Sequence, residues 1–456
     1  MKLRSVMCSA AVLLAASVLW ASAQSQSPAQ PRPQASAAAQ PAPADDPIRL
    51  LVGRLDLERY KATIKGLTQF GDRRQGTDRN RAATDWIEAQ LKSYGCTNTE
   101  RIKYDYQPPQ RAAASGGAAA AAGRAATGAA GAAGGGAPST GARAGTAGAA
   151  GADAPPAAAQ GRGGRGGGNP PKGNRGPTGV NNDPMKQPDV KLRELDSQPT
   201  TPGPREDVYC TKVGTIHPEE MYIVGGHMDG LGYAEAANDN GSGTALVMEL
   251  ARLFSMPDVQ TERSIRFILW NNEETGLNGA RAYVDQRHEL QGKENPAGSG
   301  KYPEPKWLGM IQHDMMLYDH GMPRADGTLP PEQRPEADVN VEFAGTSKMA
   351  NESAALAWLL RAANDRYATD YPVTVGNRMS NTDSAAFQDY VAAISLREAE
   401  RGSQVGSGWD PLWHQTIDLY ATLSDKDFKL GLTAAQTTLA AVAQLTGAKT
   451  AAGVKK

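Results

Sequence analysis

The chain has 456 residues, of which 40% are hydrophobic, so it can bury one large core or two smaller ones. Its 48 Lys and Arg residues balance 49 Asp and Glu residues, which leaves a formal net charge of -1. This balance provides no polybasic surface and argues against partners such as nucleic acid or an anionic membrane surface.

The N-terminus has the pattern of a cleaved signal peptide. A short basic stretch precedes an apolar run over residues 6–20, and the small-residue cleavage signal ASA follows it. The run is shorter than the roughly 20 residues of a membrane-spanning helix, so an uncleaved anchor is the weaker alternative. We expect residues 1–23 to be removed on export and the mature chain to be periplasmic or secreted, without membrane insertion. Residues 24–46, rich in Pro, Ala, Ser and Gln, are typical of a disordered leader.

Two helices and a strand are expected after Pro47. Residues 56–68 and 79–94 carry apolar side chains at helical spacing, with Asn80 as the candidate N-cap of the second helix. Residues 101–106 have the composition of a strand.

Two cysteines remain after removal of the signal peptide, in a compartment where a disulfide can persist. Cys96 precedes the strand at residues 101–106, and Cys210 lies late in a second strand-like stretch at residues 207–213. If these strands pair antiparallel, the thiols come together. A Cys96–Cys210 disulfide is one expectation, and two separate buried side chains are the alternative.

Residues 108–204 form a low-complexity stretch of Ala/Gly runs, Arg/Gly repeats and Pro-rich polar sequence. Almost no large apolar side chains are present to offset the entropy of ordering, which predicts a flexible insertion and not a second folded domain. The insertion would divide one domain into residues 47–107 and 205–446, followed by a C-terminal tail at 447–456.

Strands and helices alternate after the insertion. Residues 221–225 and 264–271 have the pattern of strands, and residues 243–254 and 276–287 that of helices. This alternation predicts an α/β fold with a mostly parallel central sheet and helices on both faces. In such sheets, ligands bind at the carboxyl ends of the strands.

Three polar clusters stand at these strand exits. His227 and Asp229 lie in IVGGHMDG, Asp239 lies in the Gly-rich turn AANDNGSG, and Glu273 and Glu274 lie in ILWNNEETGLNGA. Adjacent side chains of an extended segment point in opposite directions, so one Glu can bind a metal while the other serves as a general base. Histidine and carboxylate ligands with no nearby thiol suit a catalytic zinc ion.

Together, these motifs resemble those of the family 28 metallopeptidases, whose bacterial members are mostly di-zinc aminopeptidases. The resemblance extends to GMIQHDMM, which contains Asp314, and to DPLWHQTIDL, which contains His414. It implies the zinc exopeptidase fold of the phosphorylase/hydrolase type. NTDSAAF occupies the place of a family motif that commonly reads Ser-Asp-His-x-x-Phe, which makes Asp383 and Ser384 candidate substrate-binding residues. Ser384 replaces the usual His there, so substrate contacts near this loop are expected to differ.

The resemblance also implies a role for each site residue. His227 and Asp314 would bind one zinc ion, Glu274 and His414 would bind the other, and Asp239 would bridge them. Glu273 would be the general base, and Asp229 would orient His227. The family often has a cis peptide after the bridging Asp, here between Asp239 and Asn240.

The expected activity is removal of N-terminal residues from peptides by an exported, monomeric di-zinc aminopeptidase. A carboxypeptidase or a single-zinc glutaminyl cyclase on the same fold is the first alternative, and a non-catalytic binding protein is the second. His313 adjoins Asp314 but points to the opposite face of a strand, which disfavours it as a ligand.

Overall fold

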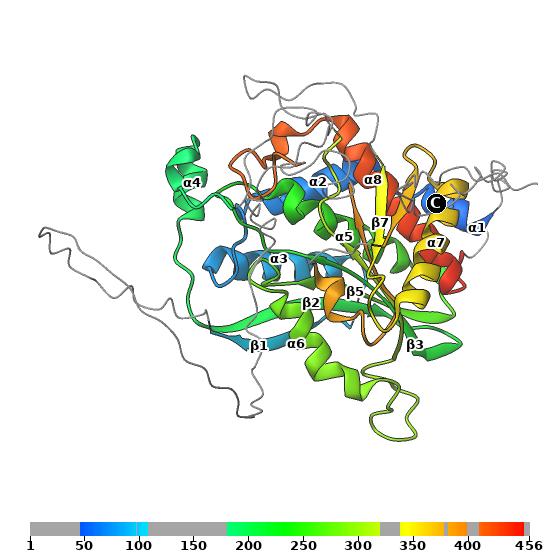
Figure 1. Cartoon of the computed structure of the whole chain (residues 1–456). Helices are drawn as coiled ribbons and strands as arrows, with labels where there is room; N and C mark the ends of the chain where they lie inside the picture. The colour runs from blue at the N-terminus through cyan, green and yellow to red at the C-terminus, as the bar shows by residue number, and fades with distance from the viewer. Residues whose placement is uncertain are drawn as a thin grey trace, which may run out of the picture. The chain divides into compact units, whose positions relative to one another are not determined.

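Figure 1 shows the computed structural model of the chain, which describes residues 46–96, 98–107, 180–319, 338–377, 382–398 and 410–450. All of them belong to one compact unit. The expected signal peptide, residues 24–45 of the expected leader, residues 108–179 of the expected insertion and residues 451–456 lie outside the described residues.

Eight strands form a mixed sheet within the described residues, in the order β1-β2-β5-β3-β6-β9-β7-β8. The central strands β5, β3, β6 and β9 are parallel to one another. On one side β2 pairs antiparallel with β5, and β1 pairs antiparallel with β2. On the other side β7 runs antiparallel to β9 and parallel to β8. The predicted α/β fold is confirmed; four of the seven strand pairs in the sheet are parallel and three are antiparallel. The sequence pattern of a buried strand reports burial on both faces and not the direction of its neighbours. The strands are β1 (Glu100–Tyr106), β2 (Gly203–Lys212), β3 (His217–His227), β5 (Arg263–Trp270), β6 (Lys306–His313), β7 (Val339–Phe343), β8 (Val373–Gly376) and β9 (Ala393–Arg397).

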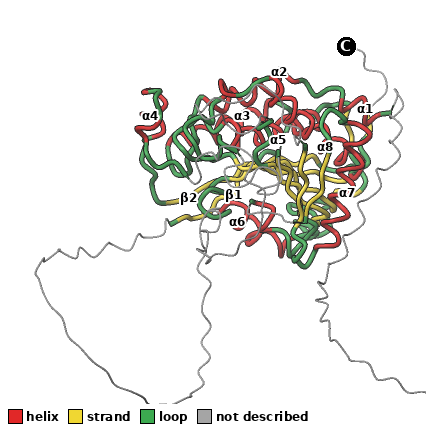
Figure 2. The backbone as a smooth tube through the Cα atoms, turned by 45° about the horizontal axis from the view of Figure 1, so that its top comes forward, coloured by secondary structure: helices red, strands yellow, loops and turns green. Residues whose placement is uncertain are grey.

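Helices cover both faces of this sheet. Figure 2 shows α2, α3, α5 and α8 on one side of the strands and α6 on the other. The helices are α1 (Pro47–Val52), α2 (Leu57–Thr68), α3 (Asp78–Ser93), α4 (Val190–Asp196), α5 (Gly243–Phe254), α6 (Asn278–Arg287), α7 (Ala350–Tyr367) and α8 (Asp425–Leu445). Short helical turns are η1 (Pro184–Lys186), η2 (Ala237–Ser242), η3 (His288–Leu290), η4 (Asp383–Ala386) and η5 (Tyr420–Thr422).

Alternating side chains of the central strands belong to two hydrophobic clusters. Val224 and Phe267 belong to the larger cluster, which includes residues of α5 and α8, whereas Ile223 and Ile268 belong to the smaller cluster beside α6. The period of two along each strand is the reason that a continuous apolar run is buried on both faces. The sheet is thereby held rigidly between its helices, and its carboxyl edge provides fixed positions for polar side chains.

The folded unit extends beyond the expected boundaries at three places. The Asp46 side chain, expected in the leader, accepts a hydrogen bond from Ile48 N at 2.9 Å and caps α1. Within the expected insertion, residues 180–204 contain η1 and α4. In the expected tail, β10 (Lys449–Thr450) pairs with β4 (Val259–Gln260). Each of these short segments is held by specific polar contacts, which composition does not reveal.

The N-cap of α3 also differs from the expectation. Thr77 caps the helix, and its side chain accepts a hydrogen bond from Asn80 N. Asn80 is buried within the helix and donates to Arg73 O at 2.7 Å and to Asn271 Oδ1 at 3.0 Å. Asn80 therefore ties α3 to the loop after β5.

The structure joins Cys96 and Cys210 in a disulfide with a Cα–Cα distance of 5.9 Å. The register of β1 and β2 is antiparallel and pairs Glu100 with Tyr209. The start of β1 thus lies beside the end of β2, which is the arrangement that brings the two sulfur atoms together.

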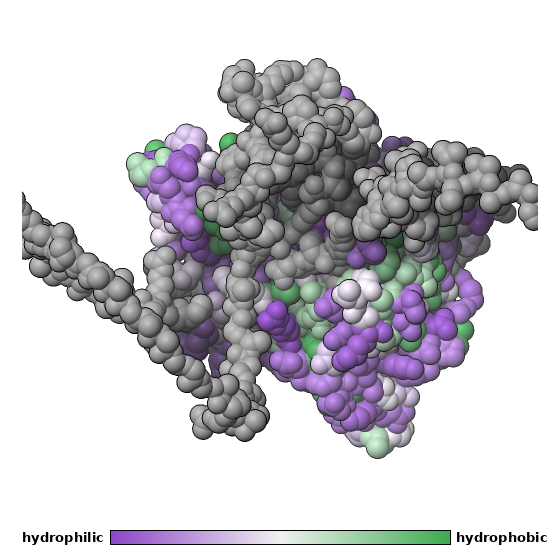
Figure 3. Space-filling model, viewed as in Figure 1, coloured by the Kyte–Doolittle hydropathy of each residue, from purple (hydrophilic) through white to green (hydrophobic). Residues whose placement is uncertain are grey.

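The described surface in the lower half of Figure 3, around α6 and the segment after it, is mainly hydrophilic. Within the described ranges, no helix has both the length and the apolar character needed to cross a membrane.

Candidate metal centre

Three neighbouring parallel strands end at one polar site. His227 is the last residue of β3, Asp314 directly follows β6, and Glu273 and Glu274 follow β5 after two asparagines. Because β5, β3 and β6 are adjacent and parallel, their carboxyl ends meet at the same edge. The side chains that the sequence places on separate motifs are therefore brought together by the sheet.

Asp239 reaches the site from η2, the turn that leads into α5. The peptide bond between Asp239 and Asn240 is cis, as the resemblance implies. The carboxylate of Asp418 accepts hydrogen bonds from Asn238 N at 2.7 Å and from Asp239 N at 3.0 Å. Asp418 thus holds the backbone of the turn from which Asp239 projects.

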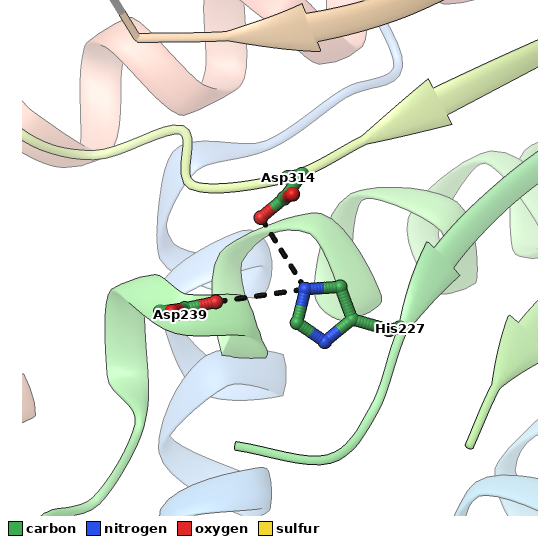
Figure 4. A group of neighbouring side chains, drawn as sticks. All are labelled: His227, Asp239 and Asp314. Carbon is green, nitrogen blue, oxygen red and sulfur yellow. Dashed lines mark hydrogen bonds and ion pairs between the residues drawn. The ribbon is translucent and has the colours of Figure 1, made fainter. Parts of the chain in front are cut away.

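His227 forms the first half of the centre with two carboxylates. Its Nε2 lies 3.3 Å from Asp314 Oδ1 and 3.5 Å from Asp239 Oδ1. Figure 4 shows both carboxylates directed at this same ring nitrogen, Asp314 from the strand end and Asp239 from the turn. All three side chains are buried.

His414 forms the second half, from a loop between β9 and α8. Its Nε2 lies 2.8 Å from Glu274 Oε2 and 3.1 Å from Asp239 Oδ2. The two oxygen atoms of Asp239 are therefore divided between the two histidines. This is the arrangement expected of a carboxylate that bridges two metal ions.

The donor set fits zinc. Three overlapping groups of side chains place their candidate ligand atoms within 4.8 Å of one another: His227, Asp239 and Asp314; His227, Glu273 and Glu274; and Asp239, Glu274 and His414. Imidazole and carboxylate donors without thiolates suit a catalytic zinc site. In the described part of the chain, the buried Glu274 Oε1 has no hydrogen-bond partner. A buried carboxylate oxygen without a partner is costly unless a cation compensates it.

The buried carboxylates and histidines of the site shift one another's pKa values. Burial raises the pKa of Glu274 to about 7, against the opposing effect of His414. Burial alone would lower the pKa of His227, but the carboxylates of Glu273 and Asp314 raise it well above its ordinary value. Such an excess of buried carboxylates favours the binding of cations.

Glu273 lies beside the ligands and is buried. Burial raises its pKa well above the ordinary value, while His227 lowers it and the carboxylates of Asp383 and Glu274 add to the increase. A carboxylate with a raised pKa holds a proton more readily than a free carboxylate, which suits the role of a general base.

Asp229 contacts His227 differently from the implied arrangement. His227 Nδ1 lies 3.0 Å from the main-chain oxygen of Asp229, whereas the nearest carboxylate oxygen is 3.9 Å away. The Asp229 carboxylate instead accepts a hydrogen bond from Glu273 N at 3.0 Å. In the structure, the backbone of Asp229 orients the imidazole and its side chain positions Glu273.

Asp383 and Ser384 are buried in η4. Asp383 Oδ2 accepts a hydrogen bond from Gln312 Nε2 at 2.8 Å, and Gln312 Oε1 in turn accepts one from Trp270 Nε1 at 3.1 Å. Burial raises the pKa of Asp383 well above its ordinary value, and His227 opposes this increase. Asp383 is thus fixed within electrostatic reach of the centre, and substrate contacts of either residue stay a prediction.

The described structure adds Arg397, which sequence analysis does not assign. Arg397 is the last residue of β9 and is fully buried, and its Nη2 lies 2.8 Å from Asp314 Oδ2. One oxygen of Asp314 therefore contacts His227 while the other is held by Arg397. The available signal was the apolar run AAISLR, whose end reaches the same edge as the other strands.

His313 has a structural role. Its Nδ1 lies 3.1 Å from Gly225 O, and its Nε2 lies 2.9 Å from Thr438 Oγ1. Burial lowers the pKa of His313 to about 4, so the ring is neutral at physiological pH. Both nitrogens face the core and not the carboxylates.

The described site residues lie within a region that matches a known family model. Residues 208–436, half of the chain, match the model of peptidase family M28. The Bacillus subtilis aminopeptidase YwaD is 39% identical over 79 residues, and Carboxypeptidase Q of Xenopus laevis is 34% identical over 85 residues. These matches cover 17% and 18% of this chain and the same shares of the two relatives, so the chain spans less than a fifth of their lengths in these alignments.

A solved structure supports the fold assignment. The aminopeptidase from Aneurinibacillus sp. strain AM-1 superposes with a TM-score of 0.51 at 16% identity, over 89% of this chain and 97% of that one. This likeness concerns the fold alone. With the family model matched over half of its length and the strand-end ligands brought together, the chain belongs to peptidase family M28.

Proposed function

We propose that this protein is an exported di-zinc aminopeptidase. The observation that carries the proposal is the position of Asp239, whose two oxygens lie 3.5 Å from His227 Nε2 and 3.1 Å from His414 Nε2. Family membership supports peptidase chemistry, and the aminopeptidases among its relatives support cleavage at the N-terminus.

The ligands would divide into two sets that share Asp239. His227 and Asp314 would hold one zinc ion, and Glu274 and His414 would hold the other. Bound zinc would lower the pKa of a water molecule and polarise the scissile carbonyl. Three carboxylate ligands against two divalent ions leave a net charge of about +1 in the ligand sphere, which favours an anionic oxygen without binding product tightly.

Glu273 would move the proton during hydrolysis. Its carboxylate would take a proton from the attacking water and deliver it to the leaving amine. Asp229 would hold Glu273 through the hydrogen bond to its backbone nitrogen, while Arg397 would keep Asp314 turned toward His227. The substrate would be a peptide with a free N-terminal amine.

Metal content and substrate preference test the proposal together. Zinc per chain would be measured alongside hydrolysis of amino-acid p-nitroanilides and N-blocked peptides, for wild type, Glu273→Gln and Glu274→Gln. We expect two zinc ions in wild type and in Glu273→Gln, with activity in that variant reduced by about 10²- to 10⁴-fold. Glu274→Gln is the matched control, because it changes the adjacent carboxylate and should weaken binding of one zinc ion.

Other outcomes would redirect the assignment. Activity confined to blocked peptides with free carboxyl ends would establish a carboxypeptidase, which the likeness to Carboxypeptidase Q makes the second candidate. One zinc ion with amide formation would establish a cyclase. Full activity of Glu273→Gln would remove the proposed general base.

A further inference from the structure

The segment that precedes β2 contacts both loops of the candidate centre. We call residues 180–196 the strap, residues 228–236 the β3 loop and residues 411–419 the His414 loop. The β3 loop follows His227, and the other loop contains His414. The strap contains η1 and α4, and composition alone assigns it to the low-complexity insertion.

Asn181 of the strap bridges the two loops. Its backbone nitrogen donates a hydrogen bond to His414 O at 3.0 Å, and its side-chain Nδ2 donates one to Gly232 O at 3.1 Å. The Asn181 side chain is buried. One residue therefore fixes the backbone of a candidate metal ligand relative to the loop after the other histidine.

Gln187 makes a second bridge of the same kind. Its Nε2 donates to Tyr233 O at 2.7 Å and to Thr416 O at 3.1 Å. Its Oε1 accepts a hydrogen bond from Asp189 N at 3.1 Å, and the residue is fully buried. The amide thus uses both donor hydrogens on the two loops and is oriented by the strap itself.

The two loops also approach each other closely at Gly232. This residue has φ +105, and a Cβ atom there would lie 2.6 Å from the His414 carbonyl carbon. The spacing between the loops is therefore tight. The bridges from Asn181 and Gln187 reach the β3 loop at Gly232 itself and at the next residue, Tyr233.

The strap is anchored independently of the metal centre. Asp196 Oδ1 accepts a hydrogen bond from Asp72 N at 3.1 Å and lies 3.2 Å from Arg79 Nη1. Arg193 Nη1 donates to Gln187 O at 3.1 Å. The contacts of Asp196 attach the α4 end of the strap to the rest of the fold, and the contact of Arg193 joins α4 to Gln187 within the strap.

His414 needs such support more than His227 does. Metal-binding histidines are normally oriented by a hydrogen bond from the second ring nitrogen, as His227 is by Asp229 O. Within the described ranges, His414 Nδ1 has no hydrogen-bond partner. The direction of its ring therefore depends on the placement of its backbone and on the ring of Trp413, which stacks on it at a centroid distance of 4.4 Å.

We propose that Asn181 and Gln187 are positioning residues of the metal centre, which place His414 by fixing its loop against the β3 loop. This inference rests on the proposed two-zinc function. It assigns a role to the strap, which contains none of the residues of the sequence motifs.

Zinc affinity measured by competition with a chelator tests this role. Gln187→Met keeps the bulk of the side chain without its donors. Asn181→Ala removes the side-chain bond to Gly232 O and so breaks the bridge, while the backbone bond to His414 O remains. Asn182→Ala is the matched control, because Asn182 is an exposed neighbour whose side chain, among the residues that the structure describes, donates to Val180 O and to neither loop. His227→Ala and His414→Ala identify which of the two binding steps belongs to each histidine.

We expect Gln187→Met and Asn181→Ala to weaken the His414 step by about tenfold or more and to leave the His227 step unchanged. At limiting zinc, kcat should fall with little change in KM, and Asn182→Ala should match wild type. Equal weakening of both steps, or a lower melting temperature with unchanged zinc affinities, would overturn the inference. A wild-type protein that binds fewer than two zinc ions would instead overturn the proposed function.

Discussion

The two histidines of the candidate centre are held in different ways. His227 ends a central strand, and its second ring nitrogen is bound to a backbone oxygen. His414 lies in a loop and has a backbone φ of 56°, and its position depends on contacts from other segments. A ligand at the end of a strand inherits its position from the sheet, whereas a loop ligand must be positioned by tertiary contacts.

Asp239 joins the two halves, so its loss should have the largest effect. Asp239→Ala would remove a ligand from both zinc ions, and we expect activity to fall by on the order of 10³-fold, which corresponds to about 4 kcal/mol. Zinc content and kcat/KM measure this effect. Asp285→Ala, which changes an exposed acid on α6, is the control. Loss of only one zinc ion from Asp239→Ala would show that this carboxylate does not bridge.

A variant of Arg397 tests how strongly the half of the centre that contains His227 and Asp314 is held. Arg397→Met would remove the guanidinium that lies 2.8 Å from the buried Asp314 carboxylate, and the free energy of unfolding of the zinc-free protein should fall by about 3–5 kcal/mol. Zinc should reduce this loss, because the metal also compensates Asp314. Denaturant unfolding with and without zinc provides the measurement.

The surface pair of Arg361 and Asp365 provides the comparison for that variant. Arg361→Met should change stability by about 1 kcal/mol or less, because exposed ion pairs contribute little. An equally small effect for Arg397→Met would contradict the role inferred for this guanidinium.

Variants of Asp229 distinguish two possible roles of its side chain, orienting His227 and positioning Glu273. We expect Asp229→Ala to reduce kcat by about 10- to 100-fold while His227 keeps its backbone hydrogen bond and zinc remains bound. Asp229→Asn retains an oxygen that can accept from Glu273 N and should recover most of the activity. If both variants lose zinc from the His227 step, the side chain orients the imidazole after all.

Replacing Asp196 should have the smallest effect, which is a change in the way the free energy of unfolding depends on pH. Burial and then the neighbouring Asp72 raise its pKa to about 8, against the opposing effect of Arg79. A raised acid pKa means that the folded state binds more protons than the unfolded state between about pH 4 and 8, so this contribution to stability falls as pH rises through that range. Asp196→Asn should flatten this decrease, measured by urea unfolding of the zinc-saturated protein at several pH values. An unchanged slope would show that Asp196 is ionised throughout.

Regular elements near the motifs were predictable because their patterns are local. The helix at residues 243–254 has the predicted bounds, and the central strands that carry His227 and the Glu pair lie where apolar runs indicate them. The strand before Arg397 was missed, since a short buried run can belong to a strand or to a helix. Antiparallel pairing of β1 with β2 was considered as the condition for the disulfide, whereas the antiparallel direction of β7 was not predicted, because burial does not encode strand direction.

Sequence alone determined the chemistry of this protein: which imidazoles and carboxylates are available, and that the motifs at strand exits resemble a zinc peptidase. Tertiary structure decided how they are held. The division of Asp239 between two histidines, the link from Arg397 to Asp314 and the bridges from Asn181 and Gln187 all join residues far apart in the chain. Such contacts depend on distances between loops and strands, and these distances are set by packing of the whole unit and not by any local pattern.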